Sequence, residues 1–578
     1  MKPSHPNKHP KISTFVPSIN WANNYSEEDL GSDIFSGIIT ALLFIPQAMA
    51  YAMLAGLPVQ IGLYASLLPP AIYALFGTSK VLSVGPVSIA AIMVASAISA
   101  PHIQSLGSPI ESAIILAFEG GLVLLIMAIF RMGGLVNFIS HPVLSGFTSA
   151  AAVLIILSQL PNLLGISSPL DCSLNMNCYI DYASGINQST LTIGLFSLAF
   201  ILFMGAPLVT LLKKISVNES IISAISKAAP LLAIIITTII VSTLNLASQS
   251  NVSIVGEIPS GLPDLNLSFL TSSTDLWREL LPSAIFISLI AYIESVAIAK
   301  VVANLTRHKI NPNQELIALG FANFGSALSG GMPVAGGFSR TMVNYSAGAK
   351  TQLATLFTVV VLCISILFFS TWFSEIPKAA LASIILVAIF PLIKLKELIT
   401  IWRIDISDGI SLLLTFIGVL ILGIEQGIAL GVIVTIINYL RRASRPHIAI
   451  VGRIKNTEQY RNIARHKVET WDDLIIIRID ENITFSNNAY ISDFIEQQVI
   501  LNTPKHLVLL FSSVSHLDIS AIHLLENLIP NLKDKGVVLS LAEVKGPVMD
   551  ILNKTELVKQ LSPGKIYFNI SDAIADLT

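Results

Sequence analysis

The chain has 578 residues, of which 53% are hydrophobic and 12% are charged, and its mean hydropathy is +0.74. A soluble globular chain carries about 25% charged residues, so this composition indicates a protein whose main solvent is lipid. The net charge of −2 provides no basic field for nucleic acid, and three cysteines are too few for a disulfide scaffold or a cysteine-rich metal site.

The N-terminal 32 residues are polar and lack the apolar core of a signal peptide, so we interpret them as a cytoplasmic tail. The run from Ser26 to Asp29 predicts a cap for the first helix that enters the membrane. Cys172 and Cys178 share one polar loop; they either form a disulfide, if that loop is extracytoplasmic, or are free thiols. Cys363 lies in an apolar run and is expected to pack.

Apolar runs then fill the chain as far as Leu440, and most approach the roughly 20 residues that cross a bilayer. The uninterrupted runs are residues 34–50, 62–76, 110–130, 143–160, 191–211, 231–246, 281–302, 353–370, 381–393, 410–422 and 428–440. Three others are short or interrupted: residues 84–100, 316–330 and 339–349. The sequence therefore predicts about 14 membrane segments.

Lysine and arginine fall in alternate connections between these segments. The residues concerned are Lys80, Arg131, Lys213, Lys214, Lys227, Arg307, Lys309, Lys350, Lys394, Lys396, Arg403, Arg441 and Arg442. The connections near residues 101–109 and 162–189 contain neither type. The positive-inside rule assigns the basic connections to the cytoplasm, and an even number of crossings then leaves both termini there.

Two of the short segments are interrupted in a similar way, at residues 83–88 (Ser-Val-Gly-Pro-Val-Ser) and 332–340 (Met-Pro-Val-Ala-Gly-Gly-Phe-Ser-Arg). Pro86 suits the first turn of a helix, and Gly336 and Gly337 permit backbone that a side chain would block. Irregular backbone at membrane depth persists only inside protein or beside a cavity. Two half-helices that begin there point free N–H groups at one place, which predicts an anion site. The breaks lie in the third and tenth segments, the spacing of two inverted seven-segment repeats.

Two charged residues lie in or beside these apolar segments. Glu294 is in the middle of a run, where a carboxyl group is costly and marks a functional candidate. Burial favours its neutral form, so it is a candidate proton-binding group; the alternative is a structural carboxyl held by hydrogen bonds. Arg340 opens the second half-helix, where its charge complements an anion. The alternative is an ion pair with Glu294 or another acid, and both roles hold if the pair opens when the anion binds.

The first segment contains Gln47, directly after Pro46, with Tyr51 one turn further on. The Gln47 amide offers uncharged donors to an anion, with Tyr51 as a wall of the pocket. Alternatively, Pro46 kinks the helix and Gln47 satisfies the carbonyl that the proline frees. Glu119, in the fourth segment, is either a second functional carboxyl or a packing contact.

From Arg445 onward the composition becomes polar and charged. Residues 474–479, 506–511 and 537–541 predict strands, and residues 488–501, 520–535 and 547–561 predict helices. This alternation predicts a small α/β domain. It contains no Walker-type phosphate loop and no metal-ligand cluster, so we expect transport driven by gradients, with no cofactor.

Several motifs resemble those of the SulP family of sulfate permeases, which are anion transporters, and the resemblance covers nearly the whole chain. The matching stretches are residues 45–51 (Ile-Pro-Gln-Ala-Met-Ala-Tyr), 55–58 (Ala-Gly-Leu-Pro), 83–86 (Ser-Val-Gly-Pro), 313–316 (Asn-Gln-Glu-Leu), 333–341 (Pro-Val-Ala-Gly-Gly-Phe-Ser-Arg-Thr) and 348–352 (Gly-Ala-Lys-Thr-Gln). The C-terminal part resembles the STAS domain that follows the membrane part in this family.

The resemblance implies an α-helical polytopic membrane protein with two inverted seven-segment repeats, divided into a core domain and a gate domain. It also implies a homodimer in which the core moves like an elevator. We expect a cytoplasmic tail over residues 1–32, the transporter domain over 33–442 and a cytoplasmic STAS domain over 446–578.

The resemblance also implies where the anion binds, which is between the third and tenth segments and near the first. The corresponding residues are Gln47, Tyr51, Val87, Ser88, Ser339 and Arg340. Glu294 matches the acidic position linked to the coupling ion, usually a proton. Similar sodium-coupled bicarbonate carriers have Asp there and Thr one turn later, so Ile298 at the later position counts against sodium.

In the C-terminal domain, residues 517–521 (Leu-Asp-Ile-Ser-Ala) resemble the loop in which anti-sigma antagonists carry a phosphorylatable serine. Ser520 takes that position, although Ala521 departs from the usual glycine. Ser520 is therefore a candidate regulatory site, and a regulatory protein is a candidate partner. The alternative is a helix cap formed by Asp518 or Ser520.

These observations predict a proton-coupled secondary transporter of sulfate or a similar small inorganic anion, and not an enzyme. We expect it in a bacterial inner (plasma) membrane. The alternatives are a sodium-independent bicarbonate or dicarboxylate carrier, an anion exchanger without a proton, and a membrane-anchored signalling protein. A protein whose membrane helices only anchor a signalling domain does not need two matched helix breaks.

Overall fold

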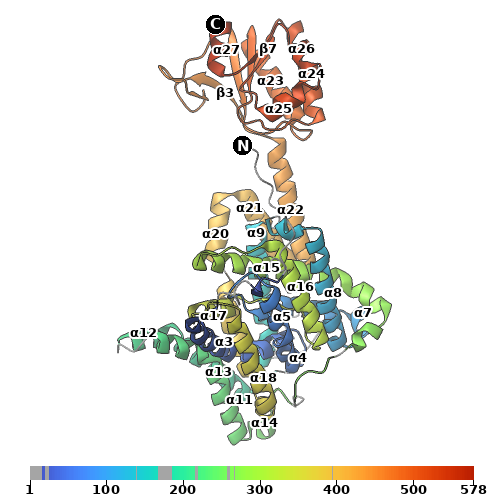
Figure 1. The fold of residues 1–578 in the computed structure, drawn as a ribbon, viewed down its shortest axis with the longest axis vertical. Helices are drawn as coiled ribbons and strands as arrows, with labels where there is room; N and C mark the ends of the chain where they lie inside the picture. Colours follow the sequence, from blue (N-terminus) through green and yellow to red (C-terminus); the bar gives the residue numbers. More distant parts are fainter. Residues whose placement is uncertain are drawn as a thin grey trace. The chain divides into compact units, whose positions relative to one another are not determined.

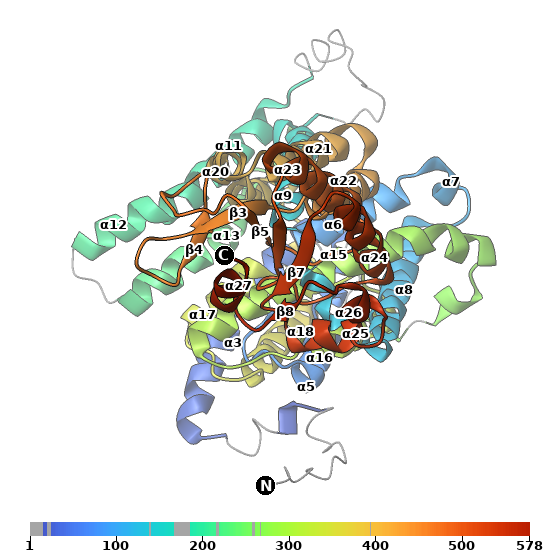
Figure 2. The ribbon, with the colours of Figure 1, turned by 90° about the horizontal axis from the view of Figure 1, so that it is seen from above.

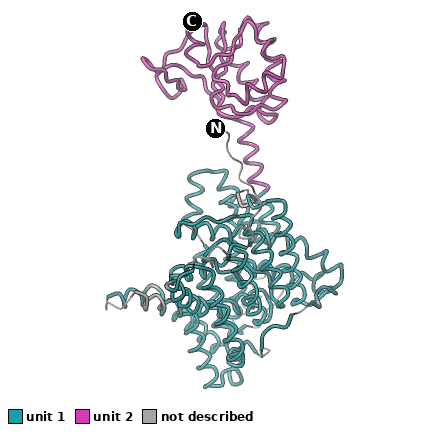
Figure 3. The backbone as a smooth tube through the Cα atoms, in the orientation of Figure 1, with its two compact units in different colours: residues 1–432 teal, residues 433–578 magenta. Residues whose placement is uncertain are grey.

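The computed structural model describes residues 16–19, 25–137, 140–166, 185–214, 219–256, 261–265, 267–393 and 395–578. The question of pairing between Cys172 and Cys178 lies outside these residues. The chain divides into two compact units, residues 1–432 and 433–578, and each is described by itself (Figure 3).

The first unit is built of helices, many of them apolar (Figure 1). Among the described residues, seven helices are long and apolar enough to cross a membrane, or up to eight if one bent pair counts as a span. The seven are α3 (Glu27–Leu54), α4 (Val59–Tyr64) continued by α5 (Leu68–Phe76), α8 (Pro109–Ile129), α9 (His141–Leu164), α15 (Thr274–Thr306), α18 (Leu353–Phe373) and α22 (Ile424–Ser444). The bent pair is α11 (Gln188–Met204) with α12 (Ala206–Lys214).

The other predicted segments also correspond to helices, most of them shorter. They are α6 (Ser88–Ile98), α13 (Glu219–Thr243), α16 (Pro312–Leu328), α17 (Phe338–Ser346), α19 (Lys378–Ile389) and α21 (Ile406–Leu422). Short connecting elements are α7 (Pro101–Gln104), α14 (Leu246–Gln249), α20 (Leu395–Ile404) and the 3₁₀ turns η1 (Met132–Asn137), η2 (Ser268–Thr271) and η3 (Phe390–Leu392). The interrupted third and tenth segments form helices of only 11 and 9 residues.

Local capping signals set the beginning of several long helices. The Ser26 side chain accepts a hydrogen bond from the Asp29 amide at 3.2 Å and so caps α3, as the sequence predicts. At α8, Ser108 and Glu111 form a reciprocal capping box directly before the apolar run. The chain thus satisfies the first N–H groups of these helices with its own side chains.

The helices pack in two groups. In one group, α8, α15 and α16 contact one another, and α3 packs against α17 and α18 (Figures 1 and 2). In the other group, α9 packs against α19 and α21, and α11 packs against α19. Contacts of α3 with α13 and α19 join the two groups.

A buried polar network fixes α3 against the end of the tenth segment. Asp33, which is fully buried, accepts hydrogen bonds from the Lys350 amide at 2.7 Å and the Thr351 hydroxyl at 2.6 Å. One turn along α3, the Ser36 hydroxyl bonds the Asn344 side-chain oxygen at 2.6 Å. Buried polar groups that are all paired specify one arrangement, so α3 is held in a fixed position beside α17.

The second unit contains a six-stranded sheet in the order β4-β3-β5-β6-β7-β8. Strands β5 to β8 are parallel, and β3 joins them antiparallel to β5. The strands are β3 (Ile448–Arg453), β4 (Tyr460–Asn462), β5 (Leu474–Ile479), β6 (His506–Leu510), β7 (Val538–Ala542) and β8 (Ile566–Tyr567). The helices are α23 (Asn488–Asn502), α24 (Ile519–Asp534), α25 (Gly546–Leu552), α26 (Leu557–Gln560) and α27 (Ile570–Leu577).

Both faces of this sheet are covered, which explains the continuous apolar run of β5. Ile475 and Ile477 pack in the cluster that includes α23, α24 and α25, whereas Leu474 and Ile476 pack with α27. The three predicted strands are confirmed within one residue at each end. The predicted helix over 547–561 is wrong as a single helix, because residues 553–556 separate α25 from α26.

Candidate functional site

The two interrupted segments meet at their breaks. Strand β1 (Val84–Gly85) pairs antiparallel with β2 (Ala335–Gly336), with Val84 opposite Gly336. The Gly337 amide adds a hydrogen bond to the Ser83 carbonyl oxygen at 2.9 Å. Helix α6 begins three residues after β1, and α17 begins two residues after β2, so the N-terminal ends of both half-helices lie beside this short ribbon. The predicted break at each site is confirmed.

Neither half-helix has a side-chain cap. The residue preceding α6 is Val87 and the residue preceding α17 is Gly337, and neither position supplies a side-chain oxygen. Some described helices of this unit are capped, α15 by Ser273 and α16 by Asn311, whereas others, such as α9, α18 and α19, also lack a side-chain cap. The first-turn N–H groups of α6 and α17 are therefore free to bind an anion, which the helix dipoles also favour.

The sequence suggested that Pro86 lies in the first turn of α6. In the structure it lies two residues before that helix. Its role is different, because its carbonyl oxygen accepts a hydrogen bond from Arg340 Nη1 at 2.8 Å. Arg340, on α17, is 1% exposed and is among the largest fully buried side chains of the described chain.

Arg340 is only partly satisfied by the protein. Its guanidinium lies 4.3 Å from the centre of the Phe44 ring, a cation–π contact. Its Nε and Nη2 atoms are buried without a hydrogen-bond partner among the described residues. Buried donors without partners are costly, and a bound anion beside the two half-helix ends would satisfy them.

Glycines make room for this arginine. A Cβ atom at Gly337 would lie 2.7 Å from Arg340 Nη2 and 2.8 Å from its Cζ. A Cβ atom at Gly85 would collide with the ring of Phe44. Any larger residue at either position would therefore displace the guanidinium or the ring beneath it.

The predicted residues of α3 share one face of that helix. Phe44, Gln47 and Tyr51 are spaced by three and four residues, and all three are buried. The Tyr51 side chain lies near those of Ser88, Arg340 and Glu294. Helix α3 continues through Pro46, and the Gln47 side chain makes no hydrogen bond with the described residues, so it does not satisfy the carbonyl freed by that proline.

The remaining predicted contacts lie at the half-helix ends. Val87 is buried, Ser88 is half-buried and Ser339 is exposed. The structure thus brings Tyr51, Ser88 and Arg340 together and places Val87 and Ser339 on the adjoining backbone.

Glu294 lies on α15 beside the same ribbon. Its neighbour Ser295 accepts a hydrogen bond from the Gly336 amide at 2.8 Å, which ties α15 to the second break. The Glu294 side chain is half-buried, and its Oε2 has no hydrogen-bond partner among the described residues. Within the described chain no ion pair joins Glu294 to Arg340, although the two side chains are close enough to interact electrostatically. The alternatives of a closed ion pair and of a fully hydrogen-bonded carboxyl therefore do not match this structure.

Three contributors to the site were not singled out from the sequence: Phe44, Ser295 and Asn323. Asn323 bonds both the amide and the carbonyl of Val334, at 2.9 and 3.1 Å, and so supports the extended backbone before β2. Asn323 is a polar residue in an apolar run, and this feature of the sequence could have identified it as a candidate. Phe44 and Ser295 carry no such signal beyond their closeness to Gln47 and Glu294.

Two further buried carboxyls differ in their surroundings. Glu315, fully buried, accepts hydrogen bonds from the Tyr73 hydroxyl at 2.7 Å and the Thr78 amide at 2.8 Å, which marks a structural role. Glu119 is 5% exposed, and its Oε2 has no hydrogen-bond partner among the described residues.

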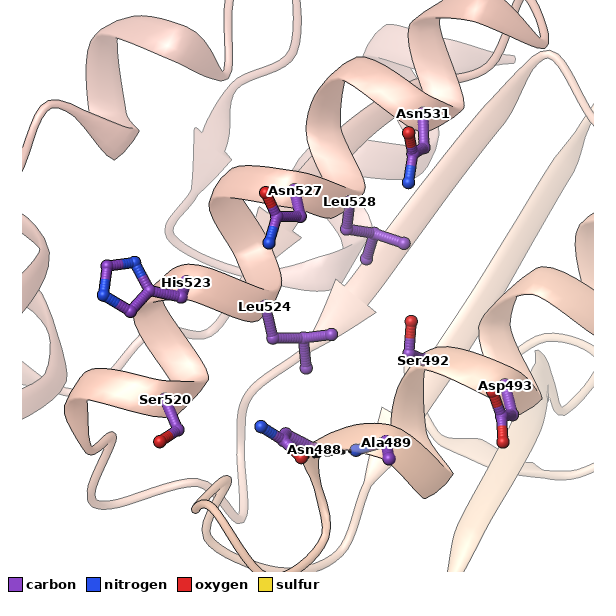
Figure 4. A pocket seen from close by; sticks show the side chains of 10 residues that line it. All are labelled: Asn488, Ala489, Ser492, Asp493, Ser520, His523, Leu524, Asn527, Leu528 and Asn531. Carbon is purple, nitrogen blue, oxygen red and sulfur yellow. Dashed lines mark hydrogen bonds between the residues drawn. The ribbon is translucent and has the colours of Figure 1, made fainter.

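In the second unit, Asp518 and not Ser520 caps α24, because the Asp518 side chain accepts the Ala521 amide at 2.9 Å. The Ser520 hydroxyl makes no hydrogen bond with the described residues. Figure 4 shows it at one end of a groove between α23 and α24, which it lines together with Asn488, Ser492 and Asn527. The groove has a volume of about 530 Å³.

Together, the apolar helices and the paired, uncapped helix ends describe a polytopic membrane protein with a candidate anion site. Profile comparison matches residues 30–415 to the sulfate permease family and residues 465–573 to the STAS domain. The chain belongs to the sulfate permease family, whose members are transporters and not enzymes, and carries a C-terminal STAS domain.

Its relatives include plant proteins. "Sulfate transporter 4.1, chloroplastic" of Arabidopsis thaliana is 33% identical over 97% of this chain and 82% of its own length. "High affinity sulfate transporter 2" of Stylosanthes hamata is 29% identical over 98% of this chain and 86% of its own.

Solved structures share the fold. The murine Solute Carrier 26 family member A9 anion transporter, in its inward-facing state, superposes with a TM-score of 0.88 at 21% identity, covering 100% of this chain and 96% of that one. The transmembrane domain of the cyanobacterium bicarbonate transporter BicA gives 0.59 at 23% identity, covering 71% of this chain and 98% of that one.

Proposed function

We propose that the protein transports sulfate, or a similar small inorganic oxyanion, by proton-coupled secondary active transport. The observation that carries the proposal is the pair of uncapped half-helix ends beside the unpartnered Nε and Nη2 of Arg340. Such a site offers several N–H donors and one fixed positive charge, which suits a compact anion with several acceptor oxygens. The names of the plant relatives favour sulfate among such anions.

In this proposal the anion contacts Gln47, Tyr51, Val87, Ser88, Ser339 and Arg340. The side chains of Gln47, Tyr51, Ser88 and Ser339 add uncharged donors, and Val87 supplies the backbone at the start of α6. Binding satisfies the Arg340 donors that are otherwise buried without partners.

Glu294 is proposed as the proton-binding group. Its side chain lies within electrostatic range of Arg340. When an anion occupies the site, it neutralises part of the field of Arg340 that favours the ionised carboxyl, so Glu294 binds a proton more readily. Anion and proton then bind together, which is the coupling that a symporter needs.

Movement is proposed to be of the elevator type. The group containing α3, α6, α15 and α17 carries the whole site and moves as a core against the gate formed by α9, α11, α19 and α21. Both termini lie in the cytoplasm, the tail covers residues 1–32, the transporter domain 33–442 and the STAS domain 446–578, and the protein is a homodimer. Ser520 is proposed as a regulatory position where a partner protein binds.

The test is sulfate uptake into proteoliposomes under an inward proton gradient, compared between the wild type and Glu294→Gln. The wild type accumulates sulfate when the outside is acidic, whereas the variant loses this pH dependence and retains sulfate exchange. A variant with the uptake kinetics of the wild type across acidic pH contradicts the role of Glu294. Uptake of bicarbonate or a dicarboxylate in preference to sulfate, in a competition panel, supports the alternative carrier.

A further inference from the structure

A second polar cavity lies in the first unit, beyond the C-terminal ends of α3 and α6. Its volume is about 500 Å³, and it is bounded by those helix ends, by α7, by α9 and by the beginning of α22. None of the described residues that line it is charged. Its polar lining consists of Ser96, Ser99, Gln104, Ser158, Gln159 and Asn162.

The same two helices connect this cavity to the half-helix ends. On α6, Ser88 lies at the anion site and Ser96 lies in the cavity, a separation of about 12 Å at the helical rise per residue. On α3, Tyr51 lies at the site and Leu54 lines the cavity, less than one turn further on. The cavity and the anion site are therefore neighbours along the same two helices.

Hydrogen bonds within the cavity wall leave donors free. Gln159 is 3% exposed; its Nε2 donates to the Ser158 hydroxyl at 3.2 Å, and its Oε1 accepts from Asn162 Nδ2 at 3.4 Å. Each of the two amide nitrogens carries a second hydrogen atom that this chain of bonds does not use. The Gln159 and Asn162 oxygens also keep lone pairs, so the wall presents both donors and acceptors and carries no charge among the described lining residues. The unused N–H donors are the groups that can hold an anion there.

The walls come from both packing groups. Helices α3 and α6 belong to the group that carries the anion site, whereas α9 belongs to the other group. Gln104, Pro109 and Asn162 line the cavity and belong to the connections 101–109 and 162–189. The sequence of these connections contains no lysine or arginine, and the positive-inside rule assigns them to the extracytoplasmic side.

We propose that this cavity is an outer waiting site for the transported oxyanion, which neutral amide and hydroxyl donors hold before it moves to Arg340. Neutral donors bind an anion weakly, so the site fills from outside and releases inward to the stronger, charged site. This inference rests on the proposed function and adds a second binding site to it.

The test compares sulfate KM from the two sides of the membrane. Right-side-out and inside-out vesicles from cells that produce the full chain give the outer and inner KM respectively. The double variant Gln159→Leu/Asn162→Leu raises the outer KM roughly two- to tenfold, the effect of losing one or two neutral hydrogen bonds, and leaves the inner KM unchanged. Thr148→Val, on the same helix but outside the cavity lining, changes neither value.

Asn162→Asp provides a second variant, in which the side chain keeps nearly the same size and shape. Its negative charge repels the anion, so its outer KM rises more than that of the single variant Asn162→Leu, which is measured beside it, and the difference shrinks at high salt. Equal changes on both sides, or an unchanged outer KM in both variants, would overturn the waiting site while leaving the anion transporter intact. A wild type without sulfate flux in either vesicle type would overturn the proposed function as well.

Discussion

Arg340 donates Nη1 to the Pro86 carbonyl oxygen at 2.8 Å, so a side chain of the second half-helix holds the backbone break that precedes the first. The two breaks are 254 residues apart in the chain, yet this bond and the β1–β2 pair join them directly. The same guanidinium keeps Nε and Nη2 unpartnered among the described residues. One residue thus both assembles the site and supplies its charge.

Replacing Arg340 tests this double role. Arg340→Ala removes the charge and its charge-assisted hydrogen bonds, and we expect sulfate affinity to fall roughly 10- to 100-fold. Arg340→Lys keeps the charge but loses the planar fork, so its affinity should lie between those of the alanine variant and the wild type. Equilibrium binding of radiolabelled sulfate to the purified protein measures the effect. Arg278→Ala, an exposed position on α15, serves as the control, and unchanged affinity in Arg340→Ala would contradict the site.

The glycine beside Arg340 offers a test that retains every polar group. A methyl group at Gly337 would lie 2.7 Å from Arg340 Nη2, so Gly337→Ala should displace the guanidinium and reduce sulfate affinity. The matched control is Gly31→Ala, because a Cβ atom there meets nothing within 4 Å and alanine favours the helix. Sulfate transport per folded protein should fall in the first variant and persist in the second. Equal transport in both would mean that Arg340 does not need its present position.

Much of this architecture could be predicted from the sequence. The breaks at residues 83–88 and 332–340 carry Pro and Gly, which have a direct steric meaning, and the structure confirms that each precedes a short helix. The intramembrane position of Glu294 stands out against apolar neighbours. Each such signal is local, so it can be recognised without knowledge of the fold.

Contacts between distant segments could not be predicted in this way. Nothing in the sequence indicates that the Pro86 carbonyl binds Arg340, or that Phe44 lies beneath its guanidinium, since both depend on how α3, α6 and α17 pack. Asp518 and Ser520 were equal candidates for the cap of α24, because only the backbone geometry decides which side chain reaches the first turn. Three strands were not predicted: β4 and β8 contain only three and two residues, and the six residues of β3 follow directly on the last membrane helix, which hides the change of element.

The cap of α24 provides a prediction in the second unit. Asp518→Ala removes the acceptor of the Ala521 amide and should lower the local stability of α24 by about 1 kcal/mol. Ser520→Ala should leave that stability unchanged, since its hydroxyl makes no hydrogen bond with the described residues. Native-state hydrogen exchange of α24 peptides in the full chain measures both. A comparable loss of protection in Ser520→Ala would assign the serine a structural role instead.

A charged cluster joins the beginning of the second unit to its sheet and predicts a dependence on pH. His447 contacts Asp480 at 2.7 Å, and Arg478 Nε donates to the same carboxylate at 2.6 Å. Partial burial alone would raise the pKa of Asp480, but the hydrogen bonds from Arg478 and His447 lower it below its ordinary value. The ionised carboxylate therefore stabilises the fold above the unfolded pKa of about 3.9, and this contribution disappears as pH falls through the lower folded value.

Asp480→Asn should consequently increase exchange of the β3 amides roughly tenfold near neutral pH, because charge-assisted hydrogen bonds of this kind contribute about 1.5 kcal/mol. The difference between wild type and variant should shrink as the pH falls below about 3.9 and vanish once the pH is below the lowered folded pKa of Asp480, where both side chains are neutral. The comparison uses amide protection factors, which are corrected for the intrinsic pH dependence of hydrogen exchange. A difference that persists unchanged into acid would show that the cluster acts through packing and not through charge.

The most direct measurement is the anomalous scattering of selenate, an isosteric sulfate analogue, in crystals of the full-length protein. Our account predicts a selenium peak between the N-terminal ends of α6 and α17, with a selenate oxygen within hydrogen-bond distance of Arg340 Nε or Nη2. Selenate bound elsewhere, with the two helix ends empty at saturating concentration, would contradict it.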